Sequence, residues 1–74
     1  MTKFGLYLAA KSANKSEISR KTGLSKTKIN RLSMSENSHL RAEELVLIAM
    51  AIDVDPGEML KELYGHLKLK KVKN

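Results

Sequence analysis

The sequence predicts a single all-α domain built from five short helices. Three observations support this fold class: the 74 residues include one proline, contain no run of β-branched residues, and carry several residues that begin helices. A chain of this length forms one domain at most, with a thin core. Because it has no cysteine, we expect its stability to come from apolar packing in a reduced compartment, the cytoplasm.

The first two predicted helices lie in the N-terminal part of the chain. The apolar residues of the segment FGLYLAAKS fall on one face of a helix, as a stripe that faces a core does. The second helix begins at the segment NKSE, in which Asn14 is a good N-cap and Glu17 completes a capping box. It is expected to end at Gly23, because glycine readily adopts the left-handed conformation of a helix C-terminus.

The third and fourth helices are separated by a polar loop of sequence MSENSHL. The third is predicted to run from its N-cap Ser25 to about Ser33. The fourth covers roughly residues 41–52 and is apolar nearly all round, so we expect it to be the buried central helix. Its N-cap is ambiguous between Ser38 and Arg41.

The fifth helix begins at the segment DPGE, which supplies an aspartate cap, a proline at the first helical position and a glutamate that completes a capping box. Met59, Leu60 and Leu63 are expected to face inward, and the helix should stop near Gly65. The domain is therefore predicted to cover residues 1–65.

Residues 66–74 form a basic C-terminal tail in which Leu67, Leu69 and Val72 alternate with lysines. Such alternation allows an edge strand, including one that pairs across a dimer. The other interpretation is a disordered basic tail, and we favour it.

Charge is segregated along the chain, whose net charge is +6. Residues 1–33 hold eight basic residues against one acid, residues 34–65 hold two against seven, and residues 66–74 hold four and no acid. A basic region of this kind favours a polyanion as partner.

Residues 18–32 carry the spacing of two short helices that cross at a steep angle. This geometry needs a small residue at the crossing, a turn residue that tolerates positive φ, and apolar side chains that seal the angle. The small residue is Ser19, the turn residue is Gly23, and the seal consists of Ile18, Leu24, Ile29 and Leu32.

These spacings resemble the helix-turn-helix of the phage-repressor-like (Xre/Cro-type, lambda-repressor-like) DNA-binding family. The segment LVLIAMAIDVDPGEML is similar to the fourth and fifth helices of that family, so the resemblance covers roughly residues 4–64. It implies a compact five-helix DNA-binding domain whose third helix, about residues 25–33, enters the major groove. The chain departs from the family pattern at Ser19, where alanine is usual, and at Lys15, where glutamine is frequent.

The third helix is predicted to have an apolar back and a cationic front. Ile29 and Leu32 define the buried face. The residues on the outward face and its flanks are Lys26, Thr27, Lys28, Asn30 and Arg31. A helix of this kind fits the major groove, where hydrogen bonds can read base edges.

By family position, Lys26, Thr27 and Arg31 are predicted to reach base edges. Arg31 can bind guanine in a bidentate manner, Lys26 can donate to guanine, and the Thr27 methyl can meet a thymine methyl. Asn30 could read adenine or bind phosphate, and we favour phosphate slightly. The other predicted DNA-backbone contacts are Lys15, Ser16, Lys28, Asn37 and Ser38. The first two of these sit at the start of the second helix, where free N–H groups and the helix dipole suit a phosphate.

Catalysis finds little support in the sequence, and no cofactor or metal is expected. His39 and His66 are the only histidines, and neither has a partner at metal-ligand spacing. The serines lack a nucleophile signature such as G-x-S-x-G. The longest apolar run, LVLIAMAI, is too short to cross a membrane.

The function favoured by these patterns is sequence-specific binding of double-stranded DNA by a dimeric transcriptional regulator or repressor, on a palindromic operator. The resemblance implies a prokaryotic or phage protein associated with the nucleoid. Leu63, Tyr64 and Leu67 are candidates for the dimer interface. The alternative is an antitoxin-like or other protein-interaction module that keeps the helix-turn-helix fold and uses the acidic segment 34–65 for a protein partner.

Overall fold

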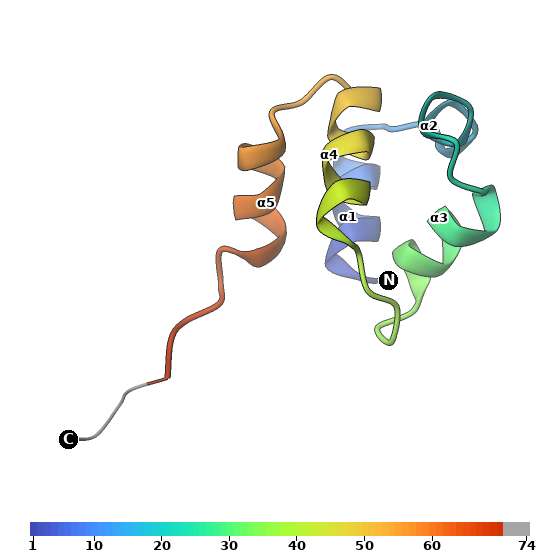
Figure 1. Cartoon of the computed structure of the whole chain (residues 1–74). Coiled ribbons are helices and arrows are strands. Elements are labelled where there is room, and N and C mark those ends of the chain that lie inside the picture. Colours follow the sequence, from blue (N-terminus) through green and yellow to red (C-terminus); the bar gives the residue numbers. More distant parts are fainter. Residues whose placement is uncertain (71–74) are drawn as a thin grey trace.

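The structure is a computed structural model that describes residues 1–70, and these residues form five helices and no strand (Figure 1). The helices are α1 (Lys3–Ala10), α2 (Lys15–Thr22), α3 (Lys26–Met34), α4 (Ala42–Ala51) and α5 (Pro56–Tyr64). In Figure 1, α2 and α3 lie on one side of the molecule, α5 lies on the opposite side, and α4 and α1 lie between them. The prediction of an all-α domain with five helices is confirmed.

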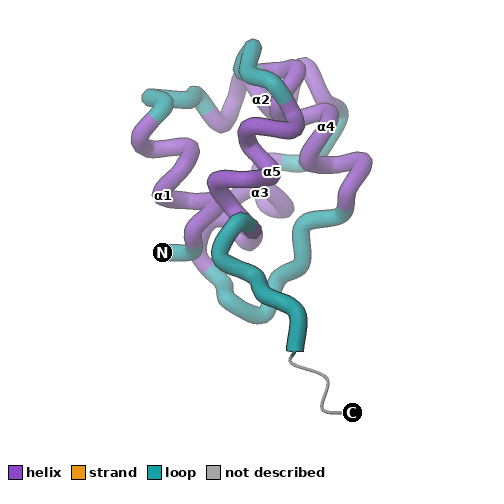
Figure 2. The backbone as a smooth tube through the Cα atoms, turned by 90° about the vertical axis from the view of Figure 1, so that its left-hand side faces the viewer, coloured by secondary structure: helices purple, strands orange, loops and turns teal. Residues whose placement is uncertain are grey.

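The helices are short and are joined by short loops, as the tube in Figure 2 shows. No helix within residues 1–70 has the length and hydrophobicity that crossing a bilayer requires. Residues 67–70 have no regular secondary structure, so Leu67 and Leu69 do not form the edge strand, which was the less favoured of the two interpretations of the tail. Val72 lies outside the described residues.

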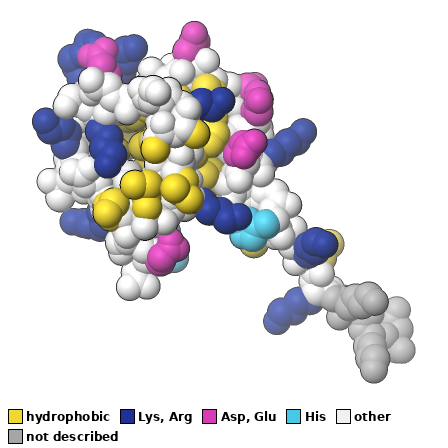
Figure 3. Space-filling view, turned by 180° about the vertical axis from the view of Figure 1, so that it is seen from behind, with side chains coloured by type: hydrophobic (Ala, Val, Ile, Leu, Met, Phe, Trp, Pro, Cys, Tyr) yellow, Lys and Arg dark blue, Asp and Glu magenta, His cyan; other side chains and the backbone are white. Residues whose placement is uncertain are grey.

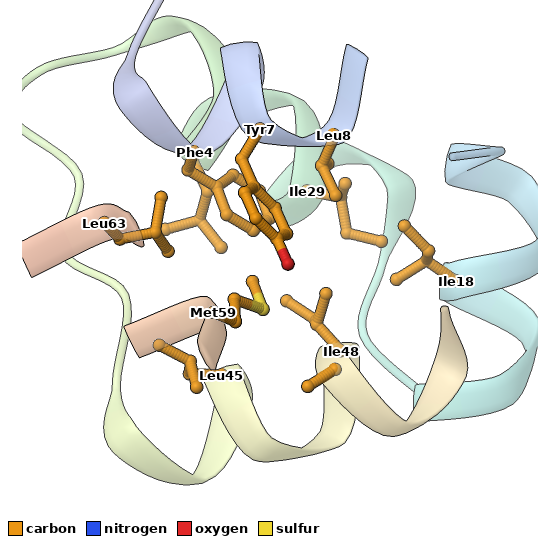
Figure 4. Close-up of a cluster of buried hydrophobic side chains, with 11 residues drawn as sticks. Phe4, Tyr7, Leu8, Ile18, Ile29, Leu45, Ile48, Met59 and Leu63 are labelled. Atoms are coloured by element: carbon orange, nitrogen blue, oxygen red, sulfur yellow. The ribbon is translucent and has the colours of Figure 1, made fainter. Parts of the chain in front are cut away.

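Every helix contributes to one apolar core between α1, α3, α4 and α5 (Figure 4). Ile29, Ile48 and Met59 have no exposed surface, and α2 adds a single core residue, Ile18. The complete set of buried apolar residues is Phe4, Tyr7, Leu8, Ile18, Ile29, Leu32, Leu45, Ile48, Ala49, Met59 and Leu63. Because α2 is anchored by one side chain and α3 by one face, much of the surface of both helices stays available to solvent.

The prediction that α4 is the buried central helix is right about its place between the other helices (Figure 1) and wrong about its burial on one side. Leu45, Ile48 and Ala49 face the core, whereas Val46, Leu47 and Met50 are 42%, 41% and 68% exposed. The physical reason is that the contacts of α4 with α2 and α5 leave the side that carries Val46, Leu47 and Met50 without a neighbouring helix among the described residues. The apolar composition of this helix therefore predicted more buried surface than the structure shows.

Leu60 was expected to face inward, and this prediction is also wrong, since its side chain is 50% exposed. Met59 and Leu63 are four residues apart and share the buried face of α5. Leu60 is turned by one residue, about 100°, from Met59 and therefore leaves that face.

The helix starts differ in detail from the capping boxes that the sequence suggests. Arg41 and not Ser38 precedes α4, and its N–H donates to Glu44 Oε1 at 2.9 Å. At α2, Asn14 caps the helix, but within the described hydrogen bonds the Glu17 carboxylate binds Arg20 instead of returning to Asn14. The starts of α2 and α4 are therefore both capped. Among the described hydrogen bonds, only at α4 does a glutamate three residues into the helix accept from the N–H of the N-cap residue.

The N-terminus is tied to the end of α3 by contacts that the sequence did not reveal. The Thr2 hydroxyl lies 2.7 Å from the Leu32 carbonyl oxygen and 2.9 Å from that of Ser33, and the Thr2 N–H donates to the Ser33 carbonyl at 2.9 Å. Gly5 lies so close to the Ser33 carbonyl that a Cβ atom would overlap it. These contacts hold the C-terminal end of α3 against the N-terminus of the chain.

Candidate nucleic-acid interface

The turn between α2 and α3 is fixed by a glycine and by side-chain hydroxyl groups. Gly23 has φ +81° and ends α2, and its N–H donates to the Ser19 carbonyl at 2.9 Å. The Ser19 hydroxyl donates to the Leu24 carbonyl at 2.6 Å, which is a bond that an alanine at this position cannot make. Thr22 accepts from the Leu24 N–H at 3.1 Å. The crossing of the two helices is therefore held by hydrogen bonds as well as by apolar contacts.

The buried side of α3 leaves its cationic side outward. Ile29 and Leu32 are buried in the core, and Ser25 caps the helix by accepting from the Lys28 N–H at 3.0 Å. The polar residues of α3 exposed to solvent are Lys26, Thr27, Asn30 and Arg31, and Met34 at the end of the helix is exposed as well. All three predicted base-reading side chains, Lys26, Thr27 and Arg31, are thus free to meet a ligand.

The start of α2 lies beside α3, so residues far apart in the sequence form one surface. Lys15 Nζ donates to Asn30 Oδ1 at 3.0 Å, and Lys26 Nζ donates to Ser16 Oγ at 3.4 Å. We call this region the α2–α3 surface; it consists of Lys15, Ser16, Lys26, Thr27, Asn30 and Arg31. Because the partners of both lysines are neutral, the two hydrogen bonds orient the ammonium groups without cancelling their charge.

Lys28 is placed differently from the other predicted DNA contacts. Its Nζ lies 3.1 Å from Glu44 Oε2, and the Glu44 side chain is only 8% exposed. Burial alone raises the pKa of Glu44, but the hydrogen bonds from the Arg41 N–H and the Lys28 ammonium outweigh that effect and lower the pKa below its ordinary value. Lys28 therefore links α3 to the first turn of α4.

The loop between α3 and α4 adds a second set of polar groups beside Arg31. Asn37 and Ser38, both predicted as backbone contacts, line a shallow depression together with Lys28 and Arg31. His39 lies at the same depression. This position of His39 could not be predicted, because the sequence shows only that His39 lies in a polar loop after the third helix.

The charge on the α2–α3 surface is largely uncompensated. Within the described residues, Lys15, Lys26 and Arg31 form no salt bridge, whereas Arg20 is paired with Glu17 at 2.6 Å. The hydrogen bond and charge of Arg20 lower the pKa of Glu17, which keeps that carboxylate ionised. Seen from behind, basic side chains gather toward the side of α2 and α3, and several acidic ones lie toward α5 (Figure 3). This side of the molecule is suited to a polyanion.

The fold and this surface define a small helix-turn-helix DNA-binding domain. Residues 5–61 match the family model of the Cro/C1-type HTH DNA-binding domain, so the chain belongs to that family. Searches of curated proteins and of solved structures found no match. The predicted family resemblance is confirmed, and membership supports DNA as the partner.

Proposed function

We propose that this protein is a transcriptional regulator, most simply a repressor, that binds a specific double-stranded DNA sequence as a homodimer. In this proposal α3 enters the major groove and α2 crosses the DNA backbone. The observation that carries the proposal is the outward cationic face of α3, where Lys26 and Arg31 form no salt bridge within residues 1–70 and the other face of the helix is buried in the core. Such a face offers both charge for phosphates and hydrogen-bond donors for base edges.

Base reading is assigned to Lys26, Thr27 and Arg31. The guanidinium of Arg31 suits the O6 and N7 acceptors of guanine, the Lys26 ammonium suits the same acceptors, and the Thr27 methyl suits a thymine methyl. All three side chains are exposed. Their exposure and their donors support this assignment.

Contacts with the DNA backbone are assigned to residues on both sides of α3. Lys15 is hydrogen-bonded to Asn30, and Ser16 is hydrogen-bonded to Lys26, so the start of α2 and the exposed side of α3 can bind the DNA backbone together. Asn37 and Ser38 approach the backbone from the loop on the other side. Lys28 contributes less directly, because a phosphate would have to compete with Glu44 for its ammonium group.

Dimerisation is proposed because a two-fold dimer can read two half-sites of a palindromic operator, about 34–36 Å apart. Of the three candidate interface residues, Leu63 is buried within the monomer, so it cannot serve directly. Tyr64 and Leu67 are 38% and 66% exposed and remain candidates. DNA as the partner is consistent with a cytoplasmic, nucleoid-associated protein of a prokaryote or phage.

The test is to select binding sites from random duplex DNA with the purified protein, and then to measure binding of the selected site across a salt series. A palindromic consensus whose affinity falls steeply with salt is the expected result. Recovery of no consensus, with only weak salt-sensitive binding, would contradict the proposal.

A second candidate function is an antitoxin-like or other protein-interaction module. It is favoured by one observation, the exposed apolar side chains Val46, Leu47 and Met50 on α4. The failed selection described above, together with a stable complex with a protein partner, would favour this function over DNA recognition.

A further inference from the structure

Helix α4 carries an apolar stripe that the described part of the chain does not cover. The stripe consists of Val46, Leu47 and Met50, which are 42%, 41% and 68% exposed. Met50 follows Val46 by four residues and Leu47 by three, which places the three side chains on one side of the helix, whereas Leu45 and Ile48 are buried in the core. Neighbouring apolar side chains on a small protein surface are a common mark of an interaction site.

The C-terminal arm, residues 66–70, has the complementary pattern. It leaves the end of α5 and extends away from the helices (Figures 1 and 2). Leu67 and Leu69 are 66% and 99% exposed and alternate with Lys68 and Lys70. The arm therefore presents two large apolar side chains and two cations with no packing partner in the described chain.

The charges around the apolar stripe favour a basic partner. Glu43 lies on the exposed side at the start of α4, and Asp53 and Asp55 follow its end. The nearby cation is Arg41, which is 3.4 Å from Glu43 and largely exposed. Two α4 helices packed antiparallel about a two-fold axis would bring Glu43 near Asp53 of the other copy, which is unfavourable for like charges. A lysine-rich segment avoids this repulsion.

The dimensions of the two elements also agree. In an extended chain Leu67 and Leu69 are separated by roughly 6.6 Å, at 3.3 Å per residue. Along α4, Val46 and Met50 are separated by about 6 Å, at 1.5 Å per residue. An extended arm can thus place both leucines on the stripe, with Lys70 beyond Leu69 toward one end of it and Lys68 on the opposite face of the arm.

The arm of a second copy fits this role better than the arm of the same copy. His66 Nδ1 lies 3.1 Å from Lys3 Nζ, which holds the root of the arm at the start of α1. In Figure 1, α1 lies behind α4, and the arm continues away from both. The arm therefore starts on another side of the molecule and projects outward, where a second copy can accept it.

We propose that the C-terminal arm of each copy packs on the α4 apolar stripe of the other copy, forming an arm-exchanged dimer. This inference rests on the dimer in the proposed function and identifies its contact surfaces. Leu67 and Leu69 cover Val46, Leu47 and Met50, while the positive charge of Lys68 and Lys70 is favourable beside the acidic residues that flank the stripe.

The test measures the oligomeric state of the full chain by sedimentation equilibrium without DNA. The wild type is expected to be a dimer, whereas Met50→Lys and Leu69→Lys each raise the dimer dissociation constant about tenfold or more, since each places a cation in both symmetric contacts. Leu6→Lys is the matched control, because Leu6 is 57% exposed on α1, away from α4, and should leave dimerisation unchanged. Circular dichroism checks that each variant keeps its helices.

Mixing the Met50→Lys and Leu69→Lys variants distinguishes an arm-exchanged dimer from a dimer in which α4 packs directly on α4. Met50→Lys retains an intact arm and Leu69→Lys retains an intact stripe, so a mixture can form one correct contact and should regain part of its association. A Leu69→Lys variant that dimerises like the wild type would overturn the proposal in favour of direct packing of α4 on α4. A mixture that stays as monomeric as either variant alone would also overturn it.

The DNA selection keeps this inference distinct from the proposed function. A wild-type chain that is monomeric without DNA and still selects a specific site would overturn arm exchange and leave DNA recognition standing. A dimer with the expected mixing behaviour that selects no site would support arm exchange and contradict DNA recognition.

Discussion

Arg31 and Lys15 lie on the same surface but present different chemistry to DNA. The planar guanidinium of Arg31 can form two hydrogen bonds with one base, whereas the Lys15 ammonium is a point charge held toward Asn30 at the start of α2. Arg31 is therefore expected to contribute to sequence specificity, and Lys15 to affinity for DNA of any sequence.

Replacement of Arg31 by alanine should reduce the preference for the selected site over random DNA by about 1–3 kcal/mol, because a base contact is lost. Lys15→Ala should weaken binding to both DNAs alike and reduce the salt dependence. Fluorescence anisotropy with both duplexes measures these effects, and Lys61→Ala, on the exposed side of α5, is the control that should change neither. Equal losses on both duplexes for Arg31→Ala would rule out a base-reading role.

Gly5 has a steric role that its position in a helix conceals. A helix interior normally prefers alanine to glycine by about 1 kcal/mol. At Gly5 an added Cβ would overlap the backbone oxygen of Ser33, so Gly5→Ala should push α1 from the end of α3 and reduce the unfolding free energy by about 1–3 kcal/mol. Urea denaturation measures the change, with Leu6→Ala as an exposed control on the same helix. Stabilisation by Gly5→Ala would contradict this close packing.

At the scale of helices, the pairing of Lys28 with Glu44 joins α3 to α4. Glu44 also accepts from the Arg41 N–H, so one carboxylate both caps α4 and fixes the helix that faces DNA. The pKa of Glu44 is lowered in the folded chain, which means that folding favours its charged form. The stability it contributes is therefore complete above the unfolded pKa, near 4.5, and is lost as the pH falls through the lower folded pKa.

Glu44→Gln should reduce the unfolding free energy by about 0.5–1.5 kcal/mol at neutral pH, because the amide keeps an acceptor for the cap but loses the ion pair. The difference from the wild type should shrink as the pH falls below 4.5. Urea denaturation at several pH values measures it, and Glu43→Gln is the neighbouring control, since Glu43 is 74% exposed. A difference that is independent of pH would exclude the charge of Glu44 as its cause.

Elements defined by local rules could be predicted from the sequence. The N-caps Asn14, Ser25 and Asp55 act within one turn of the chain, and the structure places helix starts at each. The left-handed turn at Gly23 could be predicted for the same reason, since it depends on the conformational freedom of one residue. What the sequence could not resolve is which apolar residue of a short helix stays uncovered, as with Leu60 on α5.

Contacts between distant residues account for the other differences. Lys28 and Glu44 are sixteen positions apart, and Thr2 and Leu32 are thirty apart, so neither pair leaves a periodic signal in the sequence. The same limit applies to the candidate site, where the cationic residues of α3 were predictable but the linkage of Lys15 to Asn30 was not. Helical periodicity gives the direction of a side chain, whereas its partner depends on how helices pack.

For the whole molecule, the central claim is that one face of α3 packs while the other reads bases in the major groove. The most direct test replaces single guanines of the selected site with 7-deazaguanine, which lacks the N7 acceptor of the major groove and keeps its base pairing. We predict that at least one such duplex binds the wild type about tenfold more weakly, a loss of about 1.4 kcal/mol, and that Arg31→Ala binds it as it binds the parent duplex. Equal affinity of the wild type for the parent site and for every substituted duplex would contradict major-groove reading by Arg31.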